Sequence, residues 1–169
     1  IPVKNYKTLV GNGSRVLLER MLDFRGVGLD KCDDIHKWYM NAYDNDFMYL
    51  TKPYDGIIPM LQELKSLGIK TAILSNKDDT TAKKVSDDLF GNELIDLCLG
   101  ARPGKALKPN PESVQEIIER FGVENSECLY IGDTATDMET AKNAGLYSIG
   151  VLWGFRDETE LRGAGADVI

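Results

Sequence analysis

Polar side chains of three kinds follow successive apolar runs in this sequence: a hydroxyl at Ser75, an ammonium at Lys108, and carboxylates at Asp133 and Asp137. A phosphoryl group in transfer spreads negative charge over its oxygens, and stabilising that charge takes a cation, a hydrogen-bond donor and usually magnesium. Ser75 can donate a hydrogen bond and Lys108 can neutralise charge. The oxygens of Asp133 suit magnesium, and Asp137 stands one helical turn later. The residue types therefore indicate phosphoryl-transfer chemistry.

The runs before these residues alternate with helical patterns from residue 57 onward, which is typical of parallel β-α units. Strands are predicted over 69–74, 97–99, 128–131 and 147–151, and helices over 57–67, 80–89, 111–121, 135–144 and 157–161. Ligand sites of open parallel sheets lie beyond the carboxyl ends of the strands. We therefore expect Ser75, its neighbour Asn76, Lys108 and the two aspartates to meet at one edge of an α/β sheet.

Each of these residues also has an explanation that needs no ligand. Ser75 can begin a turn before a helix that an aspartate at position 78 or 79 caps. A lysine beside prolines, such as Lys108, is usually solvated, and Asp133 with Asp137 can complement a helix dipole. The functional interpretation is favoured because all three sets follow strands in succession, which unrelated loop residues rarely do.

The first third of the chain has helical spacing and no convincing strand. The segment Gly11-Asn12-Gly13-Ser14 interrupts the pattern, and Asn12 or Ser14 is the expected N-cap of the helix that follows. Pro53 and Gly56 then indicate a turn. We expect a small helical unit over residues 1–52 and an α/β core over residues 53–169.

Composition excludes several classes of function. With 20 basic and 27 acidic residues the net charge is -7, which disfavours nucleic acid and anionic membranes as partners. One histidine and three cysteines without a Cys-x-x-Cys pair provide no zinc cluster, and free thiols fit a reducing cytoplasm. No run approaches the length of a membrane span. An anionic substrate must therefore be bound by locally placed cations, amides or a metal.

Three segments resemble the second, third and fourth motifs of the haloacid dehalogenase superfamily: Ile-Leu-Ser-Asn-Lys (73–77), Lys-Pro-Asn-Pro (108–111) and Gly-Asp-Thr-Ala-Thr-Asp (132–137). Three more segments, at 10–13, 100–104 and 141–145, are similar to the phosphoglycolate phosphatase-like branch. The resemblance implies a Rossmann-like parallel sheet with a small helical cap over residues 1–52. It also implies magnesium-dependent hydrolysis of a small phosphorylated metabolite through an aspartyl-phosphate intermediate.

Carried over residue by residue, the resemblance implies that Ser75 binds phosphate with Asn76, and that Lys108 steadies the nucleophile and the transferring group. Asp133 and Asp137 then serve the magnesium ion. The family's first motif, Asp-x-Asp-Gly-Thr, supplies the nucleophile and the general acid and base, and it has no counterpart in this sequence. We therefore expect the 169-residue chain to be inactive by itself.

Other functions remain open. A phosphomutase of the same superfamily uses the same serine, lysine and aspartates, and a non-catalytic module can keep a phosphate pocket without a nucleophile. A dehalogenase is disfavoured, because carbon–halogen displacement gives no reason for a magnesium-binding pair. Four basic residues are candidates for binding a carboxylate or a second phosphate of the substrate, although each is more often a solvated surface charge or an ion-pair partner: Arg15, Arg20, Arg102 and Lys105.

The absent first motif also affects the expected sheet. In the resembled fold the first strand lies between the strands predicted here at 69–74 and 128–131, and the chain begins where the cap would already be under way. Omitting four or five buried apolar side chains at roughly 1.5–3 kcal/mol each forfeits on the order of 10 kcal/mol, comparable with the stability of a domain. Two unpaired strand edges are then expected to face a slot.

We accordingly predict that the 169-residue chain is not a stable monomer in this fold. We expect that a retained fragment or another chain, including one bound by self-association, fills the slot, or that the sequence is incomplete. Intact mass combined with size-exclusion chromatography under native conditions measures this. A single monomeric species with one cooperative melting transition would contradict the prediction.

Overall fold

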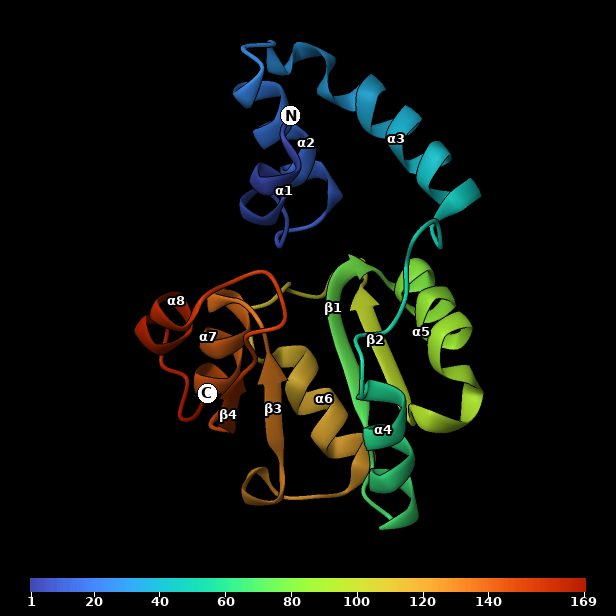
Figure 1. Cartoon of the computed structure of the whole chain (residues 1–169), viewed down its shortest axis with the longest axis vertical. Coiled ribbons are helices and arrows are strands. Elements are labelled where there is room, and N and C mark those ends of the chain that lie inside the picture. Colours follow the sequence, from blue (N-terminus) through green and yellow to red (C-terminus); the bar gives the residue numbers. More distant parts are fainter. The chain divides into compact units, whose positions relative to one another are not determined.

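The computed structural model describes the backbone of residues 1–169 and every side chain except those of residues 3 and 4. It is a mixed α/β structure with helices at both ends and short strands between them (Figure 1). The chain divides into two compact units, Ile1–Gly100 and Ala101–Ile169. The elements in chain order are α1 (Val3–Leu9), α2 (Ser14–Phe24), α3 (Cys32–Asp46), α4 (Ile57–Ser66), β1 (Ala72–Asp78), α5 (Asp79–Leu94), β2 (Leu97–Ala101), α6 (Glu112–Phe121), β3 (Leu129–Gly132), α7 (Ala135–Ala144), β4 (Tyr147–Gly150) and α8 (Glu158–Gly163), with 3-10 turns at Leu29–Lys31 and Asn125–Glu127.

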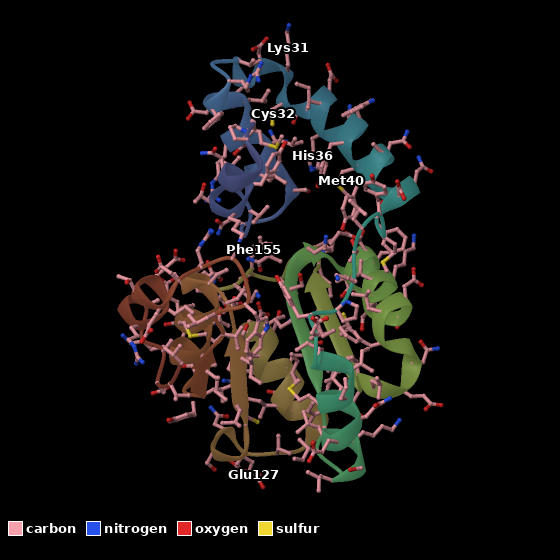
Figure 2. All side chains as sticks on the ribbon, in the orientation of Figure 1. Lys31, Cys32, His36, Met40, Glu127 and Phe155 are labelled. Atoms are coloured by element: carbon pink, nitrogen blue, oxygen red, sulfur yellow. The ribbon has the colours of Figure 1, made fainter. Side chains whose placement is uncertain are left out.

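The predicted helical segment is confirmed, because the secondary structure assigned in residues 1–52 is entirely helical. Its core joins Leu18 and Leu22 of α2 to Cys32 of α3. Cys32 and His36 stand one turn apart on α3, and the ring of His36 lies 2.9 Å from the hydroxyl of Ser14 (Figure 2). That residues 1–52 form a cap separate from the core remains a prediction.

The expected N-cap of α2 was wrong. Gly13 occupies that position with φ of +88°, and neither Asn12 nor Ser14 caps the helix. Both side chains are engaged elsewhere: Asn12 accepts a 2.7 Å hydrogen bond from Arg20, and Ser14 pairs with His36. Side-chain contacts with later residues therefore override the local capping preference.

Strand β1 is displaced from its predicted position at 69–74. Gly68, with φ of +73°, ends α4, and the Ile69 amide still bonds back to that helix. The Thr71 amide donates to the Asp96 carboxylate, so the strand begins only at Ala72. Ser75, Asn76 and Lys77 consequently lie within the last part of the strand rather than after it.

Strand β1 joins β2 in a two-stranded sheet and leads directly into α5. Asp78 is the N-cap of α5 and accepts a hydrogen bond from the Thr81 amide at 3.2 Å. Gly100 lies at the end of β2, where a Cβ atom would stand 2.5 Å from the Asp79 Cα. Glycine is therefore required for the close approach of these two segments.

The second unit contains a parallel pair of strands. Leu129 is in register with Tyr147 and Gly132 with Gly150. Helix α7, which packs on both strands, has the bounds that the sequence predicted and buries Met138, Ala141 and Ala144 completely or nearly so (Figure 1). Near the C-terminus, Val168 forms a parallel bridge to Ile149.

Among the described residues the strands form two separate sheets, β1–β2 and β3–β4. Leu129, Ile131 and Tyr147 on the second sheet are 63%, 51% and 53% exposed, although side chains of this size are usually buried in a sheet. The predicted slot filled by another chain or fragment remains a prediction. No helix in the described part of the chain is long and apolar enough to cross a membrane.

A carboxylate ties the C-terminal segment to β4 and yields a pH-dependent prediction. The hydroxyl and the amide of Ser148 each donate to Asp167 at 2.7 Å, and these bonds hold the pKa of Asp167 below its ordinary value of 3.8. A lowered pKa stabilises the folded state fully above the unfolded-state pKa, and this contribution is lost as the pH falls through the folded-state pKa.

We expect Asp167→Asn to lower the melting temperature near pH 6, and we expect its difference from the wild type to shrink as the pH falls below 3.8. Circular dichroism melts of both proteins at several pH values measure the difference. Asp44→Asn, at an exposed position on α3, is the matched control and should follow the wild type. A difference that stays constant with pH would contradict the role of the charge.

Candidate active site

The loop between β3 and α7 places two carboxylates close together. Thr134 is the N-cap of α7, and Asp137 completes a capping box with it. A Cβ atom on Gly132 would lie 2.2 Å from the Cβ of Asp137. Only glycine at this position allows the strand to pass so close to the Asp137 side chain.

Asp137 is the main acceptor of this loop. Its Oδ2 atom accepts hydrogen bonds from the Thr134 hydroxyl at 2.8 Å, the Thr134 amide at 3.2 Å and the Asp133 amide at 3.3 Å. A carboxylate has about four lone-pair positions, so these donors occupy most of one side of the group. Asp137 therefore fixes the conformation of the loop that carries Asp133.

The other oxygen of Asp137 accepts from Lys108. The Lys108 Nζ atom lies 2.7 Å from Asp137 Oδ1, and the two side chains are only 14% and 10% exposed. An ion pair this well buried is little screened by salt. The sequence placed Lys108 and Asp137 at one sheet edge, and the structure brings them into direct contact within one unit.

The loop that carries Lys108 has two further attachments. The peptide between Lys108 and Pro109 is cis, and the Pro109 carbonyl accepts a 2.9 Å hydrogen bond from Asn143 on α7. At its other end, Arg102 donates to both oxygens of Glu116, at 2.9 and 2.7 Å. This bidentate contact is the first cause that keeps the pKa of Glu116 below its usual value.

The basic residues considered for a second substrate group are all engaged within the protein. Arg102 pairs with Glu116, and Lys105 pairs with Glu112 at 2.7 Å. Arg15 contacts two carboxylates on the helical segment, and Arg20 donates to the Leu9 carbonyl and to Asn12. The ion-pairing interpretation therefore describes Arg15, Arg102 and Lys105, whereas Arg20 donates to uncharged acceptors.

Asp133 is held by a loop that the sequence reasoning did not identify. Phe155 lies in the segment between β4 and α8 (Figure 2), and its amide donates to Asp133 Oδ2 at 2.8 Å. A Cβ atom on Gly154 would lie 2.2 Å from the same oxygen. The available signal was a glycine just beyond the fourth predicted strand, where ligand-binding loops occur.

Tyr130 is a second residue that was missed. It lies on β3, and burial together with the charge of Asp137 raises the pKa of its hydroxyl above the ordinary value. In the sequence Tyr130 resembles any aromatic residue of a strand, so nothing in the local pattern reveals the influence of Asp137 on its hydroxyl.

Ser75, Asn76 and Lys77 belong to the other unit. The Ser75 hydroxyl accepts a 3.1 Å hydrogen bond from the Lys77 amide, and the Asn76 side-chain amide donates to the Gly11 carbonyl at 3.3 Å. Asn76 is only 9% exposed. The meeting of Ser75 and Asn76 with Lys108, Asp133 and Asp137 in one site remains a prediction.

The carboxylates of the described residues fit magnesium better than zinc. No group of three or more histidine, cysteine or acidic residues in the described part of the chain is arranged to hold a metal. Magnesium is usually bound by one or two carboxylates, with phosphate and water completing the shell. Asp133 fits the role of ligand, and Asp137 fits that of an orienting neighbour. Asp44 and Asp46 have the Asp-x-Asp spacing of the family's first motif, but they lie on helix α3 and not after a strand.

Comparison with known proteins gives consistent matches. The family model for haloacid dehalogenase-like hydrolases matches residues 1–145. A phosphoglycolate phosphatase of Aquifex aeolicus is 36% identical over 156 residues, covering 89% of this chain and 68% of the relative. A phosphoglycolate phosphatase of Neisseria gonorrhoeae is 31% identical over 167 residues, covering 95% of this chain and 70% of the relative.

Solved structures agree with this comparison. A Lactobacillus delbrueckii subsp. bulgaricus protein assigned as a phosphoglycolate phosphatase superposes with a TM-score of 0.92 at 26% identity, over 100% of this chain and 79% of that one. A haloacid dehalogenase-like hydrolase of Streptococcus pneumoniae has a TM-score of 0.86 at 21% identity, over 100% and 77% of the two chains. The second likeness is one of fold alone. Together they confirm the expected Rossmann-like α/β fold.

The buried ion pair between Lys108 and Asp137 is expected to stabilise the folded protein. Asp137→Ala leaves the Lys108 ammonium poorly exposed and without its carboxylate, and breaking one side of a buried pair costs about 3 kcal/mol of unfolding free energy. Lys108→Met should cost less, because Asp137 keeps its donors in the loop. Urea denaturation of the variants measures both effects.

Glu158→Ala is the matched control for this measurement. Its pair with Arg162 is about half exposed, so the loss should stay within about 0.5 kcal/mol. A loss for Asp137→Ala no larger than that of the control would show that the pair does not hold the loop.

Proposed function

Because this chain belongs to the haloacid dehalogenase-like hydrolase family, we propose that it is the substrate-binding and metal-binding part of a magnesium-dependent phosphatase of small phosphorylated metabolites. The relatives named as phosphoglycolate phosphatases support a substrate of that kind. The observation that carries the proposal is the buried Lys108–Asp137 pair, held at 2.7 Å beside Asp133. A cation next to a carboxylate of this kind suits a transferring phosphoryl group and its counterion.

In the proposed chemistry each residue has one task. The Ser75 hydroxyl and the Asn76 amide donate to the phosphoryl oxygens. The Lys108 ammonium offsets the charge that develops on the phosphoryl group and on its attacking carboxylate. Asp137 keeps Lys108 in place, since a lysine side chain otherwise samples many rotamers. These interactions stabilise charge that is most spread out in the transition state.

Asp133 is the proposed magnesium ligand. A magnesium ion held by Asp133 would act as a Lewis acid and would offset negative charge on a phosphoryl oxygen. The Phe155 amide orients the Asp133 carboxylate, and the missing Cβ of Gly154 makes room for it. The loop between β4 and α8 thereby contributes to the site without presenting a side chain to the substrate.

Hydrolysis through an aspartyl phosphate needs a nucleophilic aspartate, which the family carries in its Asp-x-Asp-Gly-Thr motif. These 169 residues contain no such motif. An aspartate carboxylate attacks phosphorus, the ester P–O bond breaks, and the alcohol leaves with a proton from a general acid. Water then cleaves the acyl phosphate, which releases phosphate and restores the carboxylate. We propose that the 169-residue chain alone does not turn over substrate, and that its three free thiols fit a cytoplasmic protein.

The test compares two forms of the protein. The product of the complete gene and the 169-residue chain are assayed with p-nitrophenyl phosphate, with and without magnesium. We expect magnesium-dependent release of nitrophenol only from the former. Asp133→Asn should lower its kcat/KM about 100-fold. Gly154→Ala should raise the magnesium concentration needed for half-maximal rate.

Glu158→Ala, outside the proposed site, is the control and should keep the wild-type rate. Absence of magnesium-dependent activity in the product of the complete gene would refute the phosphatase proposal. Turnover by the 169-residue chain alone would refute its proposed inactivity.

A further inference from the structure

Lys77 places a second cation beside the proposed phosphate-binding serine. Both residues lie on β1, and residues two apart on a strand point to the same face with Cα atoms about 6.6 Å apart. Lys77 is exposed, whereas Ser75 is partly buried. A ligand held at Ser75 therefore has an ammonium group within reach of its other end.

Tyr43 of helix α3 holds this ammonium. The Lys77 Nζ atom lies 2.5 Å from the Tyr43 hydroxyl and 4.5 Å from the centre of its ring. Tyr43 is itself stacked on Tyr39, with ring centres 5.9 Å apart. A neutral aromatic ring restrains a cation without cancelling its charge. Lys77 is thus positioned and still able to attract an anion.

The neighbouring carboxylates bond with other groups. Asp78 accepts from the Thr81 amide, and Asp79 binds Lys83 at 2.6 Å and the Gly100 amide at 2.8 Å. Among the described side chains, no ion pair within 4.0 Å joins Lys77 to a carboxylate. Lys77 differs in this respect from Arg15, Arg102 and Lys105, which all have acidic partners.

The loop before α2 contacts this strand end. The Gly11 carbonyl accepts from Asn76, and a Cβ atom on Gly13 would lie 3.8 Å from the Asn76 carbonyl oxygen. Helix α2 starts directly after Gly13 and has no acidic residue in its first turn. The first turn of α2 therefore brings no carboxylate to the neighbourhood of Asn76.

We propose that Lys77 determines specificity by binding the carboxylate of a small phosphate ester. Tyr43 is the positioning residue that keeps the ammonium beside the strand. This inference rests on the proposed phosphatase function. The Lys77 ammonium donates hydrogen bonds to the carboxylate while the phosphate end is held at Ser75.

The test uses two esters of nearly the same size, 2-phosphoglycolate and ethyl phosphate, which differ in the carboxylate. For the product of the complete gene, Lys77→Met should lower kcat/KM for 2-phosphoglycolate roughly 10- to 100-fold, mainly through KM. The kcat/KM for ethyl phosphate should change less than about threefold, because that ester has no group for Lys77 to bind. Circular dichroism checks that the variant folds.

Three further variants separate Lys77 from general effects. Lys83→Met removes a lysine that is paired with Asp79 on α5, and it should leave both esters unaffected. Tyr43→Leu should lower kcat/KM for 2-phosphoglycolate selectively. Tyr43→Phe should lower it less, because phenylalanine keeps the ring. Adding Tyr43→Leu to Lys77→Met should have no further selective effect, because Tyr43 acts through Lys77.

The possible failures are distinguishable. If the wild-type protein hydrolyses neither ester, the phosphatase proposal fails, and the role of Lys77 fails with it. If the wild-type protein is active and Lys77→Met leaves the ratio of the two kcat/KM values unchanged, only the role of Lys77 is overturned.

Discussion

The hydrogen-bonded ion pair between Lys108 and Asp137 is the contact on which the second unit depends. It joins the loop before α6 to the start of α7, two segments 29 residues apart in sequence. An ammonium that is only 14% exposed needs a nearby anion, because the desolvation of an unpaired charge is costly. The same carboxylate accepts from Thr134 and from the Asp133 amide. One acidic side chain thus fixes both the cation and the metal-binding loop of the proposed site.

This concentration of bonds on Asp137 separates two roles that look alike in the sequence. Both aspartates follow the same strand, and either one alone could serve as a metal ligand. The donors that surround Asp137 suit it to orientation, whereas Asp133 accepts a backbone hydrogen bond from Phe155 on its Oδ2 atom. Glycines at 132 and 154 make the arrangement sterically possible, since a Cβ atom at either position would overlap an aspartate. Loop geometry, rather than residue type, supports the proposed division of roles between the two aspartates.

The sequence predicted what depends on local pattern and missed what depends on distant contacts. Helix α7 has its predicted bounds because its cap and its apolar spacing are both local signals. Strand β1 begins later than predicted because Thr71 bonds with Asp96, 25 residues further on. The amide of Phe155 reaches Asp133 across 22 residues, and a backbone donor leaves no mark on residue identity. The site was therefore predictable as a set of motifs but not as a geometry.

Lys108 and Lys77, the two lysines with proposed roles, are held by different kinds of partner in an acidic chain. With a net charge of -7, the protein as a whole repels an anionic substrate, so attraction must come from a few placed cations. Lys108 is paired with a carboxylate, which orients its ammonium group for the proposed role at the reacting phosphoryl group but offsets part of its attraction for a ground-state anion. Lys77 is fixed by the ring of Tyr43, which leaves its charge intact. A cation held by a carboxylate suits the reacting group, where differential stabilisation matters, and a cation held by an aromatic ring suits the recognition of a group that does not react.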